Sequence, residues 1–185
     1  AALLADHYVA RGDAQKALVV ARNAQTQNEK NPQAVDLLAR IQLAAGQKEN
    51  ALVSYERAAA LQPKSPVAQH RLAIAQLANG REPAARGSLV KALQLQPGYV
   101  PARSQLVALD LAAGRVAPAL ATAKETQRLA PQLPAGYVQE GDAHMAAKQY
   151  PAAAAAYSTA LQKDKNGLLL TKLHAAMGLS GQGER

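Results

Sequence analysis

The chain has 185 residues and a formal net charge of +8, and it contains no cysteine, so disulfides and thiolate metal sites are excluded. No apolar run reaches the roughly 18–20 residues that a membrane-spanning helix needs. Alanine, leucine, glutamine, arginine and lysine, which favour helices, make up most of the sequence, and alternating β-branched runs are missing. The totals predict an all-α protein without strands.

The N-terminal sequence AALLADHYVARGD begins inside a helical pattern. It has no basic segment leading into an apolar one, so it predicts no signal peptide. Because the pattern starts in mid-helix, we expect the chain to be part of a longer protein.

Four rows of residues recur with a step of 34 positions. The rows are Gly12, Gly46, Gly80 and Gly114; Ala17, Ala51, Ala85, Ala119 and Ala153; Pro63, Pro97 and Pro131; and Leu4, Leu38, Leu72 and Leu106. A fixed period of this length is typical of stacked helical hairpins.

Each repeat is predicted to be a helix, a turn and a second helix. In the second repeat, PQAVDLLARIQLAAG has Val35, Leu38 and Ile41 at the spacing of one buried helix face. Gly46 ends this helix, and the next segment, QKENALVSYERAAALQP, forms a second helix closed by Pro63. In chain order the repeats span about 1–31, 32–65, 66–99, 100–133 and 134–167, and a single helix covers 168–181, all in one solenoid domain.

The fifth repeat departs from the pattern. Glu140 stands in the leucine row, Lys148 in the glycine row and Lys165 in the proline row. We expect Glu140 to be tilted to solvent or paired. The last helix fits the period with one residue deleted, because Gly181 follows Gly114 by 67 residues.

The 34-residue pattern of small residues, leucine, glycine and proline resembles the tetratricopeptide repeat (TPR). The resemblance implies a right-handed superhelical solenoid of about eleven antiparallel helices, with the first helix of each repeat lining a concave groove. It implies a protein–protein interaction scaffold that binds a peptide or partner segment there. The groove residues that it implies are Asp36, Arg40, His70, Arg71, Ser104, Gln105, Gln139 and Asp142.

Two binding patterns of TPR proteins can be compared with these residues. The chaperone-type carboxylate clamp is absent, because its lysine and asparagine places hold Asp36 with Arg40, and His70 with Ile74. Arg71, Gln105 and Gln139 occupy the row in which long arrays hold a peptide backbone with asparagine; a backbone-holding ladder and ordinary solvated polar residues both remain open.

The segments QEGDAHMAAKQYPAAAAAYSTAL and LLLTKLHAAMGLSGQ are similar to the large TPR lipoproteins of bacterial exosortase/PEP-CTERM systems. Those proteins are associated with exopolysaccharide production and the cell envelope. This resemblance implies an envelope or periplasmic location as part of a larger export protein; without it, a cytoplasmic location is expected.

The sequence predicts no enzyme, cofactor or metal site. His7, His70, His144 and His174 have no metal-ligand spacing, and phosphate-binding loops and nucleophile elbows are missing.

The alternative to peptide binding is a module that binds RNA or another polyanion, which the positive charge favours. Most of the excess charge falls in turns and second helices, away from the groove, so nucleic acid is the weaker alternative. A third possible function is that of a purely structural segment whose groove binds nothing. Self-association through the last helix is also expected, because that helix lacks a partner.

Overall fold

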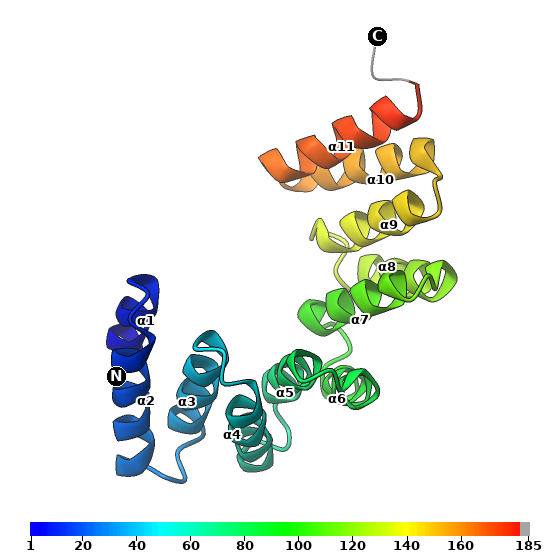
Figure 1. The fold of residues 1–185 in the computed structure, drawn as a ribbon. Coiled ribbons are helices and arrows are strands. Elements are labelled where there is room, and N and C mark those ends of the chain that lie inside the picture. The colour runs from blue at the N-terminus through cyan, green and yellow to red at the C-terminus, as the bar shows by residue number, and fades with distance from the viewer. Residues whose placement is uncertain (182–185) are drawn as a thin grey trace. The chain divides into compact units, whose positions relative to one another are not determined.

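The computed structural model describes residues 1–181, and this part of the chain consists of eleven α-helices with no strand (Figure 1). The predicted all-α class is confirmed. The chain divides into two compact units, residues 1–96 and residues 97 onward, each described by itself below. The first unit contains α1 (Ala2–Ala10), α2 (Ala14–Gln27), α3 (Pro32–Ala44), α4 (Lys48–Leu61), α5 (Pro66–Ala78) and α6 (Glu82–Leu95). The second contains α7 (Val100–Ala112), α8 (Val116–Leu129), α9 (Ala135–Ala146), α10 (Tyr150–Lys163) and α11 (Gly167–Leu179).

The second helices of the hairpins follow the period without a break. Their first residues, each 34 after the last, are Ala14, Lys48, Glu82, Val116 and Tyr150. The first helices keep the same step from Pro32 through Pro66 to Val100, but α9 begins at Ala135 because Pro134 is its N-cap. Helix α11 begins at Gly167, which is 67 residues after Val100, so the predicted one-residue deletion lies before this helix.

Each first helix ends in the same turn. Gly12, Gly46, Gly80 and Gly114 have φ between 69° and 76°, the left-handed region in which glycine meets no steric penalty. The residue after each of them donates its N–H to the carbonyl five residues earlier, as Gln47 does to Gln42 at 2.8 Å. This bond satisfies a carbonyl at the helix end. Lys148 takes the turn position of the fifth hairpin with φ 58°.

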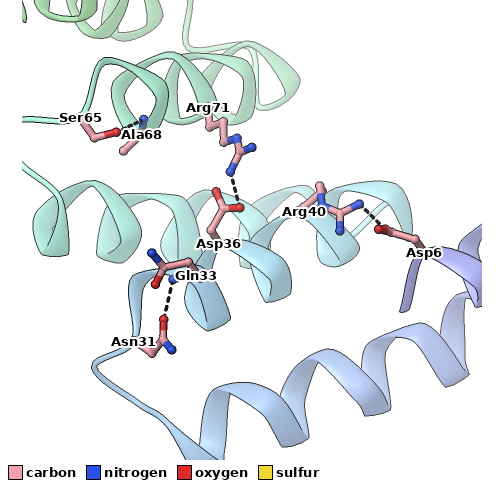
Figure 2. Close-up of polar contacts among 8 residues, drawn as sticks. All are labelled: Asp6, Asn31, Gln33, Asp36, Arg40, Ser65, Ala68 and Arg71. Carbon is pink, nitrogen blue, oxygen red and sulfur yellow. Dashed lines mark hydrogen bonds and ion pairs between the residues drawn. The ribbon is translucent and has the colours of Figure 1, made fainter. Parts of the chain in front are cut away.

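Side chains fix where the first helices of the second and third hairpins begin. Asn31 Oδ1 accepts the N–H of Gln33 at 2.9 Å, and Ser65 Oγ accepts the N–H of Ala68 at 3.2 Å (Figure 2). Proline follows each of these caps, where its missing N–H leaves no hydrogen bond unmade.

Small residues form the contacts between paired helices. Ala17, Ala51 and Ala85 are fully buried in the first unit, and Ala119 and Ala153 are fully buried in the second. Such residues let two helices approach closely. In the fifth hairpin Gly141 faces Tyr157 so closely that an added Cβ would lie 2.4 Å from the ring atom Cε1.

No helix in the described part of the chain is both long and apolar enough to cross a membrane.

Candidate peptide-binding faces

Successive first helices line a hollow of about 480 Å³ in the first unit. Its lining includes Asp36 and Arg40 of α3 and Arg71 of α5, three of the predicted groove residues. Apolar and polar neighbours complete the lining: Ala2, Pro32, Gln33, Leu37, Ala58, Gln62, Val67 and Ala68. The period therefore places these three side chains in one hollow.

The charged side chains of this hollow pair with one another and with α1. Arg71 forms an ion pair with Asp36, and Arg40 forms one with Asp6, as Figure 2 shows. Each bridge joins one first helix to the next. Both arginine side chains are 41% exposed, so each pair contributes about 1 kcal/mol or less to stability. The main effect of the two ion pairs is on the charge pattern of the surface, and their contribution to the stability of the fold is small.

His70, on α5, is half-buried and does not line the hollow of the first unit. Burial lowers the pKa of its imidazole, and the neighbouring Arg71 guanidinium lowers it further. The neutral ring is therefore favoured at physiological pH.

The second unit has a hollow of about 390 Å³ between α7, α9 and the start of α11. Ser104, Gln139 and Asp142, again three of the predicted residues, line it. The rest of the lining is Val107, Ala108, Leu111, Pro134, Ala135, Val138, Asp164, Asn166 and Leu169.

Gln139 crosses from α9 to α7. Its Nε2 donates to Ser104 Oγ at 2.8 Å, and the residue is only 5% exposed. Its other amide atom, Oε1, is buried and has no hydrogen-bond partner among the described residues. Gln105, the preceding member of the same row, is half-buried and does not line this hollow.

Asp142 is held by two donors. Its Oδ1 accepts the hydroxyl of Tyr157 at 2.6 Å and an ammonium hydrogen of Lys172 from α11. Burial raises the pKa of the Tyr157 phenol strongly, and the Asp142 carboxylate raises it further because it stabilises the protonated hydroxyl.

Three partners of these residues were not predicted from the sequence: Asp6, Tyr157 and Lys172. A signal for one of them was present, because Asp6 and Arg40 are 34 residues apart and have opposite charge. The pairs Asp36–Arg71 and Ser104–Gln139 are separated by 35 residues instead, since they join neighbouring rows of adjacent repeats.

Glu140, the acidic residue in the leucine row, is paired. Its Oε2 accepts from Gln127 Nε2 at 2.7 Å, and its Oε1 lies 4.0 Å from His144 Nε2. The structure thus places Glu140 in a polar contact between α8 and α9.

Solved structures of other proteins have the same arrangement of helices. TTC0263, a thermophilic TPR protein of Thermus thermophilus, matches with a TM-score of 0.72 and 23% identity over 94% of this chain and 95% of its own. The chain has the TPR fold. PilW, a widely conserved type IV pilus biogenesis factor, matches this TPR fold with a TM-score of 0.78 and 20% identity over 98% of this chain and 85% of its own. MamA matches it with a TM-score of 0.69 and 20% identity over 88% of this chain and 95% of its own.

No protein-family model matches the chain, and no curated protein matches it. The TPR fold is therefore established by the arrangement and period of its helices.

Proposed function

We propose that this TPR chain is a non-catalytic scaffold that binds a segment of a partner protein on the faces formed by its first helices. The observation that supports the proposal is the lining of the two hollows, which together contain six of the eight residues that the TPR resemblance implies for the groove. Each lining mixes aliphatic side chains with hydrogen-bonding groups, as suits an extended peptide or a helix. TPR neighbours such as PilW and MamA support a scaffold in general.

A charge swap in the first unit tests the proposal without removing an ion pair. Exchanging both pairs (Asp6→Arg with Arg40→Asp, and Asp36→Arg with Arg71→Asp) keeps the net charge and both bridges but inverts the charge at every position. We expect the swapped protein to lose the partners that the wild type captures from a lysate, because the inverted pattern opposes theirs. Its melting temperature should stay close to that of the wild type.

The matched control places the same kind of change on the second helices. Glu56 and Lys91 are exposed on α4 and α6, and exchanging their charges (Glu56→Lys with Lys91→Glu) leaves the hollow untouched. This control should capture the same partners as the wild type. Identical partner sets for wild-type and swapped protein would contradict binding at this face.

Two finer roles rest on narrower support. A place in a bacterial envelope or exopolysaccharide-export protein is supported by the sequence resemblance of two segments. Self-association through α11 is supported by the exposure of Leu168, Leu170 and Leu179, which are 65%, 42% and 57% exposed. Sedimentation velocity at several concentrations tests the second role: Leu168→Glu with Leu170→Glu should abolish a concentration-dependent species, and a strict monomer in the wild type would exclude it.

A further inference from the structure

The two hollows carry opposite charges in their linings. The lining in the first unit contains two arginines and one aspartate. Among residues 1–181, the lining in the second unit contains two carboxylates, Asp142 and Asp164, and no lysine, arginine or histidine. The protein as a whole has a net charge of +8, so an acidic hollow is a local reversal of its charge.

Asp164 is the carboxylate of this hollow that no cation offsets within residues 1–181. It follows α10 and is exposed, and its side chain makes no hydrogen bond or ion pair in that part of the chain. Its two lysine neighbours are directed elsewhere: Lys163 Nζ lies 4.8 Å from the centre of the Tyr137 ring, and Lys165 lines a different hollow with Leu161 and Leu170. The negative charge of Asp164 therefore remains available to a ligand.

A second acceptor belongs to the same lining. The buried Oε1 of Gln139 has no hydrogen-bond partner in the described structure, which is unfavourable for a polar atom shielded from water. A ligand would satisfy this oxygen when a small shift of the Gln139 side chain exposes it to the hollow. Asp142 adds a third acceptor, because both of its contacts involve Oδ1.

Aliphatic groups complete the hollow. Val107, Leu111, Val138 and Leu169 lie in the same lining as the three acceptors. Lysine and arginine have this mixed character, with an apolar stem and a charged end that only donates hydrogen bonds.

We propose that the hollow of the second unit binds a lysine or arginine side chain, together with an adjacent aliphatic residue, of the partner segment. This inference rests on the proposed function and specifies the partner segment further: the part that contacts the second unit is positively charged. The cationic end pairs with Asp164 and reaches the second carboxylate oxygen of Asp142, while the stem contacts the aliphatic wall.

Two fluorescent peptides with the same leucines and valines test the proposal by anisotropy with the full chain. One has two central lysines, and the other has glutamates in their place. We expect the lysine peptide to bind at least about 10-fold tighter, with a preference that shrinks as salt is added. Asp164→Asn should weaken the lysine peptide by about 5-fold or more, and Glu56→Gln, on an exposed face of α4, should not change its affinity.

A blocking variant separates this hollow from other surfaces. Ala108 is exposed and lines the hollow, so Ala108→Arg should fold normally and abolish binding of the lysine peptide. Equal binding of both peptides, unchanged by Asp164→Asn, would overturn the charge selection and leave the scaffold function standing. If the wild type bound neither peptide, the inference about the second unit would be wrong. The proposed scaffold function is tested separately, and it would be wrong if the charge-swapped protein captured the same partners as the wild type.

Discussion

At the scale of single residues, the glycines of this protein divide by what surrounds them. Gly141 is required by contact, because a Cβ there would overlap the Tyr157 ring, which its hydrogen bond to Asp142 holds in place. Gly87 lies inside α6 with nothing within 4 Å of the place where a Cβ would stand.

The two positions should respond oppositely to alanine. Gly141→Ala forces the α9 and α10 helices apart and should destabilise the protein by about 1–3 kcal/mol. Gly87→Ala only removes backbone freedom from the unfolded chain and should stabilise it by about 0.5–1 kcal/mol. Urea denaturation followed by circular dichroism measures both; a neutral Gly141→Ala would mean that the two helices are not in close contact.

Buried tyrosines make stability depend on alkaline pH. Burial, with Asp36 second, raises the pKa of Tyr55 from its ordinary value of 10.0 to about 12, and Tyr157 is raised in the same direction. Between pH 10 and pH 12 the folded protein keeps phenol protons that the unfolded chain releases. The contribution of these phenols to the free energy of unfolding is therefore fully present below pH 10 and is lost as the pH rises toward 12.

Absorbance at the tyrosinate band tests this expectation. Tyr55→Phe should reduce the loss of stability between pH 10 and pH 12 and should remove one late-titrating phenol from the curve. All tyrosines titrating together near their ordinary pKa while the protein remains folded would show that burial does not protect them.

At the scale of the helices and turns, the glycine rule has one exception, which is Lys148. Its φ of 58° places a side chain in the left-handed region, which costs about 1–2 kcal/mol for an L-residue other than glycine. Lys148→Gly should therefore stabilise the protein by about 1 kcal/mol, and the matched change Gly114→Ala should destabilise it by a similar amount. Thermal melts of both variants check the signs, and destabilisation by Lys148→Gly would contradict the turn conformation.

Much of this level could be predicted from the sequence. The period located every turn, because glycine or its replacement recurs at one place in each hairpin. Of the eight groove residues that the TPR resemblance implies, six line the two hollows and His70 and Gln105 do not, while polar lining residues such as Gln62 and Asp164 were not among the eight. The cross-helix partners could not be predicted in the same way. Gln139 meets Ser104 and Lys172 meets Asp142 through the stagger of adjacent helices, which a pattern within one helix does not encode.

At the scale of the whole molecule, each unit has its own buried clusters. Leu18 and Ile41 belong to a cluster of the first unit, and Tyr157 and Ala176 belong to one of the second. Repeat proteins are stabilised mainly by contacts between neighbouring elements, so a unit with its own core needs no distant residues to fold.

Separate expression of residues 1–96 and of residues 97–185 tests this independence. We expect both fragments to show helical circular dichroism and cooperative thermal unfolding. The control is an equimolar mixture of the fragments compared with the intact chain. A fragment that is a random coil on its own would show that the division into two units does not describe folding.

The ion pairs of the first unit also limit how this array could be rebuilt. Asp36 pairs with Arg71 of the following repeat, and Arg40 pairs with Asp6 of the preceding repeat. The second repeat therefore has one charged residue matched to each of its two neighbours. Tandem duplication of residues 32–65 would set a second Arg40 against the first and would leave one aspartate facing a leucine. The repeats share a period but are not interchangeable, because the ion pairs between them form only when the repeats follow one another in this order.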